Sequence, residues 1–204
     1  DSQGICFVGK VDLPVFLQQK LKAKTGRVVI IQDTTHFRSW PDGLPEKDAA
    51  LSDLGLMTAP HEMDQSEGLT VGKHSGAHYF TVGQRKGLNI GGFREPLFVI
   101  STDTDSNIVF VGEGQEHAGL YRKGLLVKAQ EIHWIRPDKA MNAGECRDYL
   151  VRIRYRQPLQ RARIFALEAG YYIIFEKPQR GITPGQFAAW YDGEELLGSG
   201  VIDR

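Results

Sequence analysis

Cysteine is scarce in this chain of 204 residues: only Cys6 and Cys146 occur, and they lie far apart. Two such cysteines supply neither a disulfide framework nor a zinc-ligand set. The six histidines are dispersed, and no His-Glu-x-x-His or Cys-x-x-Cys pattern occurs, so the sequence predicts no metal site. So few cysteines are typical of a reducing compartment, and we expect a cytoplasmic protein.

Long apolar runs and an excess of charge are also missing. No apolar run approaches the ~18 residues of a membrane-spanning helix, and the first residues lack a signal-peptide pattern, so we expect no membrane contact. Lys and Arg number 25, as do Asp and Glu, so the whole chain has no strong field that attracts nucleic acid. Residues 147–163, however, carry six arginines and one aspartate, which makes this segment a local candidate for polyanion contact.

Short segments of β-type residues dominate from residue 77 onward. Two predicted strands, 98–100 and 108–111, flank a polar turn at 103–107. The predicted strands that follow are 124–135, 149–156, 160–167, 171–176, 186–191 and 195–203. Alternation is clean from Val151 to Arg156, where apolar and cationic residues occupy opposite faces. Many short, evenly spaced strands predict a small closed barrel, with Trp134 and Trp190 in its core.

The remaining elements make the fold class mainly β with some helix (α+β). Residues 11–23 have the apolar face of a short amphipathic helix, and 28–31 form a β-branched strand. Residues 33–70 are polar with scattered Pro, Asp and Gly, and Leu51, Leu54, Leu56 and Met57 within them suggest a small helix that covers neighbouring surface.

Thr81 to Gly92 places Arg85 and Lys86 side by side, with Gln84 before them and four glycines in twelve residues. Glycines allow close backbone approach to a ligand, and the two cations suit phosphate oxygens. The residues alone also fit a tight turn with two solvated cations. We expect this loop to shape a site entrance or to contact backbone phosphates.

Five segments in fixed order carry a resemblance to a known family. They are Asp1 to Gly9, Gly72-x-His74-x-Gly76, Thr81 to Gly92, Val151 to Gln157, and Ile182-Thr183-Pro184-Gly185-Gln186. Together they span nearly the whole chain, which resembles the tRNA-specific 2-thiouridylases, enzymes that thiolate the wobble uridine.

The resemblance implies a domain organisation. Residues 1–18 are expected to be the tail of a catalytic domain, 19–112 a central domain with an insertion at about 33–70, and 113–204 a β-barrel like those of translation factors. No Ser-Gly-Gly-x-Asp-Ser loop for ATP occurs in the chain. We therefore expect a C-terminal fragment, inactive alone, whose parent enzyme binds ATP with Mg²⁺ in a preceding domain.

Cys6 is the predicted catalytic residue. By itself, a cysteine between Ile5 and Phe7 also fits a small buried hydrophobe. The resemblance implies that it accepts sulfur as a persulfide from a sulfur carrier or a cysteine desulfurase-type donor. ATP first adenylates the uridine oxygen, and a second cysteine outside this chain then attacks the persulfide, freeing sulfur and closing a disulfide with Cys6. Cys146 matches no catalytic cysteine and is interpreted as structural.

The resemblance also implies tRNA contacts at Arg154, Tyr155 and Gln186, and we add Gln84, Arg85 and Lys86 as further candidate contacts. On a regular strand only one of Arg154 and Tyr155 points outward. Gln186 follows a Pro-Gly turn, from which an amide can reach a sugar or base edge. His74 is interpreted as fixing a turn, although a general base is the alternative.

Two other functions fit the residues. One is a stand-alone RNA-binding barrel without chemistry, in which Cys6 is dispensable. The other is a cysteine enzyme that does not act on RNA, but no histidine or acid lies in a recognisable motif with Cys6. A Ser-Gly-Gly-x-Asp-Ser loop and a further cysteine upstream of Asp1 would favour the thiouridylase.

Overall fold

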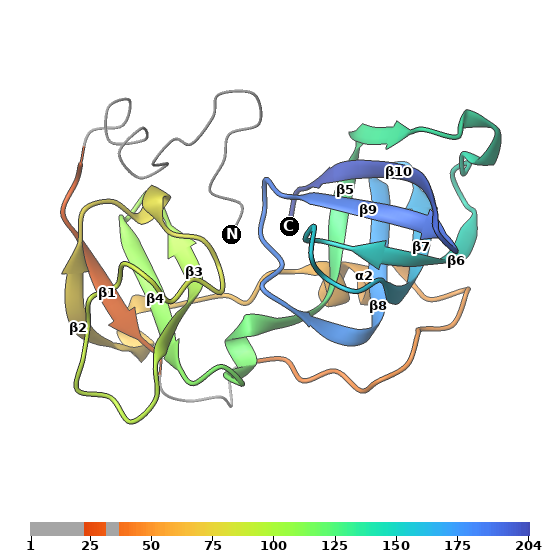
Figure 1. Cartoon of the computed structure of the whole chain (residues 1–204). Coiled ribbons are helices and arrows are strands. Elements are labelled where there is room, and N and C mark those ends of the chain that lie inside the picture. Colours follow the sequence, from red (N-terminus) through yellow and green to blue (C-terminus); the bar gives the residue numbers. More distant parts are fainter. Residues whose placement is uncertain (1–22, 32–36) are drawn as a thin grey trace. The chain divides into compact units, whose positions relative to one another are not determined.

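The computed structural model describes residues 23–31 and 37–204, which form two compact units. The described part of the first comprises residues 23–31 and 63–117, and that of the second comprises residues 37–62 and 118–204. Each unit has its own apolar core, and Figure 1 shows the sheet of the first unit and the barrel of the second. The proposed tail at 1–18 lies outside the described residues, and so does the predicted helix at 11–23 except for its last residue.

The first unit is a four-stranded sheet in the order β2-β1-β4-β3. Strand β1 pairs antiparallel with β2 and parallel with β4, while β3 and β4 form an antiparallel pair. The strands are β1 (Gly26–Ile30), β2 (Leu69–His74), β3 (Leu97–Asp103) and β4 (Ile108–Glu113). Two 3-10 turns, η1 (Gln65–Glu67) and η2 (Ala77–Tyr79), flank β2. The core is aliphatic, and it includes Val28, Val99 and Val109, none of which is accessible to solvent.

The predicted polar turn between β3 and β4 is confirmed. The Asp103 carboxylate accepts hydrogen bonds from the backbone N–H groups of Asp105 and Ser106, both at 3.0 Å, and these bonds, chiefly that from Ser106, lower the pKa of Asp103. Asn107 completes the turn with φ +55°, a left-handed conformation that Asn tolerates. Its side-chain amide accepts from Ala77 N at 3.0 Å and donates to Lys24 O at 2.9 Å, which joins three loops of the unit.

The second unit is a closed barrel in the strand order β10-β5-β8-β7-β6-β9, so the predicted mainly β fold with a barrel is confirmed. The strands are β5 (Tyr121–Trp134), β6 (Cys146–Arg152), β7 (Gln160–Leu167), β8 (Gly170–Arg180), β9 (Phe187–Asp192) and β10 (Glu195–Ile202). Two more 3-10 turns are η3 (Ala118–Leu120) and η4 (Pro137–Lys139). Inward residues of the strands fill the interior. Trp190 has no exposed surface and packs edge-on against Trp134, with 5.5 Å between the ring centroids.

Residues 37–62, which we call the strap, belong to the barrel unit although the sequence suggested an insertion in the central domain. The expected small helix exists as α2 (Leu51–Thr58) and packs against β5 and β8. Its Leu54 is fully buried in a second apolar cluster with Leu126, Phe165, Tyr172 and Ile174. This cluster lies outside the main barrel core, so the strap covers an apolar outer face of the barrel.

Two buried cations of β5 hold the strap in place. Arg122 donates from Nη2 to Thr58 O, and burial, followed by repulsion from Arg204, lowers the pKa of Arg122 to about 10. Lys123 Nζ donates to Pro41 O at 2.7 Å, to Gly43 O at 2.8 Å and to Glu176 O at 3.0 Å. An ammonium has three donors, so all three are satisfied by backbone carbonyls.

Candidate nucleic-acid interface

The segment after β6 is a turn and not the strand that the alternation predicted. Strand β6 ends at Arg152, and Gln157 N donates to Arg154 O at 3.1 Å to close a turn. The Gln157 side chain accepts from Ile153 N at 3.1 Å, which pins the start of the same turn. Pro158 has no N–H for a ladder and restricts the residue before it, so pairing stops here. The expectation of a strand over residues 153–156 is therefore wrong.

This turn exposes both Arg154 and Tyr155, where a strand would have turned one of them inward. Tyr155 is 87% exposed, the largest fraction among the exposed large hydrophobic residues that the structure describes. Arg154 donates from Nη2 to Gly181 O at 3.1 Å. Partial burial of its guanidinium, and then the nearby Arg180, lower the pKa of Arg154. The guanidinium is thus oriented by the backbone while the tyrosine ring projects outward.

Gln186 lies in the turn before β9, and its backbone is held on both sides. Gln186 N donates to Thr183 O at 3.3 Å, and Gln186 O accepts from Ile202 N at 2.7 Å. Gly185 has φ +82°, a conformation that glycine adopts without strain. The Thr183 hydroxyl donates to Gly181 O at 3.0 Å. Gly181 O therefore accepts from both Arg154 and Thr183, and the two predicted segments meet at this carbonyl.

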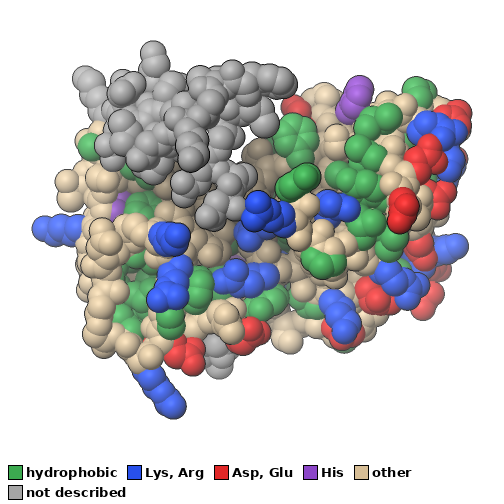
Figure 2. All heavy atoms as spheres, viewed as in Figure 1, with side chains coloured by type: hydrophobic (Ala, Val, Ile, Leu, Met, Phe, Trp, Pro, Cys, Tyr) green, Lys and Arg blue, Asp and Glu red, His purple; other side chains and the backbone are tan. Residues whose placement is uncertain are grey.

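Charge is distributed unevenly along the basic segment. Arg163 forms a two-pronged ion pair with Asp148, and Arg161 pairs with Glu176 at 2.9 Å. By contrast, residues 149–167 and 177–191, which supply the Arg154 and Gln186 turns, contain no carboxylate in their sequence. Figure 2 shows acidic side chains gathered at the end of the barrel that holds the β9–β10 turn, away from the start of β9.

The Thr81 to Gly92 loop belongs to the first unit, and Gln84 organises it. Its side-chain oxygen accepts from Thr81 N at 3.1 Å and its nitrogen donates to Lys86 O at 2.8 Å. The Gln84 amide therefore bonds within the loop. Arg85 and Lys86 are exposed beside an open hollow of about 760 Å³. Gly87, with φ +88°, turns the chain after these cations.

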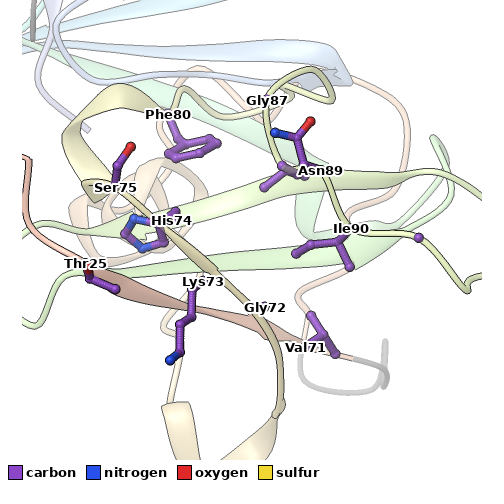
Figure 3. A pocket seen from close by; sticks show the side chains of 12 residues that line it. Thr25, Val71, Gly72, Lys73, His74, Ser75, Phe80, Gly87, Asn89 and Ile90 are labelled. Carbon is purple, nitrogen blue, oxygen red and sulfur yellow. The ribbon is translucent and has the colours of Figure 1, made fainter.

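A second hollow, of about 660 Å³, lies on the first unit between β2 and the same loop (Figure 3). Lys73, His74, Ser75 and Asn89 contribute polar side chains to its lining. His74 is buried, and its Nδ1 accepts from Gly76 N at 2.9 Å, so the proton of the neutral ring resides on Nε2. Burial is the main cause that lowers the pKa of His74. The hydrogen bond from Gly76 N agrees with the turn-fixing role.

Of the two cysteines, Cys146 belongs to the part of the chain that the structure describes. Cys6 lies outside the described residues. Cys146 begins β6, pairs with Phe165 on β7 and packs against the cluster beneath the strap. Burial raises the pKa of the Cys146 thiol, which disfavours the reactive thiolate. Cys146 therefore has the environment of a structural residue.

Phe187, the first residue of β9, is a surface feature that the sequence did not single out. The segment 186–191 was predicted only as a strand, yet Phe187 is 61% exposed and directly follows Gln186. The available signal was an aromatic residue immediately after the Pro-Gly-Gln turn.

Within residues 23–31 and 37–204, no helix is long and apolar enough to span a membrane, and no three metal-ligating side chains converge.

Comparison with known proteins assigns both units. Residues 58–113 match the family described as a tRNA methyl transferase PRC-barrel domain, and residues 124–202 match the aminomethyltransferase beta-barrel domain. The tRNA-specific 2-thiouridylases of Christiangramia forsetii and Flavobacterium johnsoniae are each 49% identical, over 99% of this chain and 51% of the relative. That of Shouchella clausii is 37% identical over 100% of this chain and 45% of its own length. The chain spans about half the length of these relatives, and it belongs to the tRNA-specific 2-thiouridylase family.

Proposed function

We propose that this chain is the tRNA-holding portion of an ATP-dependent enzyme that thiolates C2 of the wobble uridine of tRNA. Its relatives are named tRNA-specific 2-thiouridylases. The observation that carries the proposal is the meeting of two turns at Gly181 O, which brings the Arg154–Tyr155 turn and the Gln186 turn to one end of the barrel.

The chemistry at this end suits RNA. A guanidinium presents its donors in one plane, so the bond from Arg154 to Gly181 O sets the direction of the whole fork. Such a fork matches phosphate oxygens, and an exposed tyrosine ring stacks on a base. Gln186 adds an amide, which can donate to and accept from a ribose or a base edge. Residues 149–167 and 177–191 contribute no carboxylate that would repel the phosphates.

In this proposal, Cys6 carries the transferred sulfur as a persulfide delivered by a sulfur carrier or a cysteine desulfurase-type donor. ATP and Mg²⁺ bind outside this chain, since its 204 residues contain no Ser-Gly-Gly-x-Asp-Ser loop. We infer that the 204-residue chain alone binds tRNA without thiolating it. The alternative is an RNA-binding barrel with no part in the chemistry.

The binding half of the proposal is tested by titrating the 204-residue chain with an unmodified tRNA transcript across a salt series. We expect salt-sensitive binding, and we expect Arg154→Ala with Gln186→Ala to weaken it. Loss of one phosphate contact lowers the slope of log K against log salt by about one. Arg161→Ala is the matched control because it removes an exposed arginine that is already paired with Glu176. Equal losses in the control and the double variant would contradict the assigned site.

The catalytic half is tested in a full-length parent protein by measuring 2-thiouridine formation in tRNA. Cys6→Ser is expected to abolish thiolation while leaving tRNA binding intact, and Cys146→Ser is expected to retain activity. Full activity of Cys6→Ser would favour the barrel without chemistry.

A further inference from the structure

Phe187 is an exposed aromatic residue beside the Arg154–Tyr155 and Gln186 turns, and the proposed function gives it no role. In β9, Ala188 and Trp190 point into the barrel and have no exposed surface, whereas Phe187, Ala189 and Tyr191 alternate with them on the outside. The barrel core therefore makes no use of the Phe187 ring, which remains 61% exposed. A single exposed apolar residue is normal on a protein surface. Phe187 is of interest because of its position relative to the Arg154–Tyr155 turn.

The strand register places Phe187 next to that turn. Strands β6 and β9 are antiparallel neighbours, with Val151 paired to Trp190 and Arg152 to Ala189 (Figure 1). The last of these pairs, Arg152 with Ala189, lies two residues from Phe187, at the point where β6 ends and the turn begins. Phe187 also follows Gln186 directly in the chain. Phe187 thus begins β9 at the end of the barrel where the Gln186 turn lies and where β6 ends.

Arg152 connects the Tyr155 turn to the outside of β9. Its guanidinium carbon lies 4.9 Å from the centroid of the Tyr191 ring, and its Nη1 donates to Tyr155 O at 3.1 Å. Ala189, between the two outer rings of β9, contributes only a methyl group. The resulting surface, which we call the β6–β9 face, contains both aromatic rings and guanidinium groups and comprises Arg152, Arg154, Tyr155, Phe187 and Tyr191.

The charge of this face selects its occupant. At the opposite end of β9, the cations Arg136 and Lys139 are bonded to Asp138, Asp192 and Glu195, so that end is internally compensated. The β6–β9 face draws on two segments without a carboxylate, and the contrast is visible along β9 in Figure 2. Aromatic rings interleaved with arginines are the composition that binds single-stranded nucleotides, by base stacking and phosphate contact together.

We propose that Phe187 is a stacking residue that, together with Tyr155, holds an unpaired nucleotide of the tRNA on the β6–β9 face. This inference rests on the proposed function, because it assumes that the same end of the barrel meets tRNA. It adds a recognition step: the arginines bind phosphates of any RNA, whereas the two rings require a base that is not paired within a helix.

The test compares affinities of the 204-residue chain for a tRNA transcript across a salt series. Phe187→Ala is expected to weaken binding roughly ten- to a hundredfold, the range for one stacked base, with the salt slope unchanged since no charge is lost. Phe187→Tyr is expected to retain affinity, and Phe187→Leu to lose most of it. Ile135→Ala is the matched control because Ile135 is an apolar residue of the barrel that is 50% exposed outside this face.

A blunt RNA duplex without unpaired bases provides the second arm. There, Phe187→Ala and the unchanged chain are expected to bind equally, while Arg154→Ala still weakens binding. If Phe187→Ala and Ile135→Ala behave alike on tRNA while Arg154→Ala weakens binding, the stacking role is overturned and the tRNA-holding function stands. Full affinity of Phe187→Leu would show simple apolar packing and overturn stacking as well. Failure of the unchanged chain to bind tRNA at low salt would overturn both proposals.

Discussion

Replacing Lys123 by Met should release the strap while leaving the barrel folded. Lys123 is 3% exposed, and its three donors all end on backbone carbonyls, those of Pro41, Gly43 and Glu176. Two of the three acceptors lie in the strap, and Gly43 N returns a hydrogen bond to Glu176 O at 2.8 Å. Met keeps most of the length of the lysine stem, so the substitution removes the ammonium without opening a large cavity.

The magnitude follows from opposing terms. Each hydrogen bond from a charged donor contributes about 1.5–3 kcal/mol, and the desolvation of the ammonium offsets several kcal/mol of their sum. Removing one partner of a buried charged network typically costs about 3–5 kcal/mol. We expect a loss near the lower end, about 3 kcal/mol, because Glu176 O keeps its bond from Gly43 N. Such a loss raises the population of the open strap by roughly a hundredfold, at ~1.4 kcal/mol per factor of ten in an equilibrium constant.

Hydrogen exchange measured by mass spectrometry separates the strap from the barrel. In Lys123→Met we expect fast exchange of the strap segment around Gly43, which loses its bonds to the ammonium, and little change in β7. Lys128→Met is the control on the same strand, because Lys128 is half exposed and pairs with Asp203 at the surface, an interaction of at most about 1 kcal/mol. Unchanged exchange around Gly43 in Lys123→Met would refute the reasoning that the ammonium holds the strap.

Two further predictions concern the first unit. Burial lowers the pKa of His117, and a hydrogen bond to Ile31 O opposes this shift in part. The unfolded state therefore takes up the proton first as the pH decreases. The stability of this unit consequently falls below about pH 6.5. His117→Gln should reduce this acid loss, measured by exchange of β1 amides corrected for intrinsic rates; an identical loss in both proteins would rule out His117. Gln84→Ala removes the bonds to Thr81 N and Lys86 O, about 1–2 kcal/mol in all, and should speed trypsin cleavage at this loop; an unchanged cleavage rate would contradict that role.

Local periodicity predicted most of the barrel. Strand β7 occupies the predicted residues 160–167, and the other predicted barrel strands differ from the observed ones by a few residues at their ends. Inward positions were also recognisable, since Trp190 is in the core and Trp134 packs against it. Side chains that alternate between core and solvent carry this information within a few residues, so the sequence alone suffices.

The end of β6 is the instructive exception. Alternation from Val151 to Arg156 continued the strand pattern, but a side-chain bond from Ile153 N to Gln157 and the following Pro158 replace the ladder with a turn. Gln157 and Pro158 are present in the sequence. Whether they end the strand depends on three-dimensional geometry, which an alternation of apolar and polar residues does not report. This turn is what exposes both Arg154 and Tyr155.

The sequence by itself determined the family resemblance, the strand positions and the candidate contacts Arg154, Tyr155 and Gln186. Only the tertiary structure decided that the strap packs with the barrel, through Lys123 contacts some 80 residues apart in the chain. It alone also brought the Arg154 and Gln186 turns to one carbonyl, at the end of the barrel where β9 begins with Phe187. Short-range patterns specify which face of an element is apolar, whereas contacts between distant segments depend on register and barrel closure, which arise once the whole chain has folded.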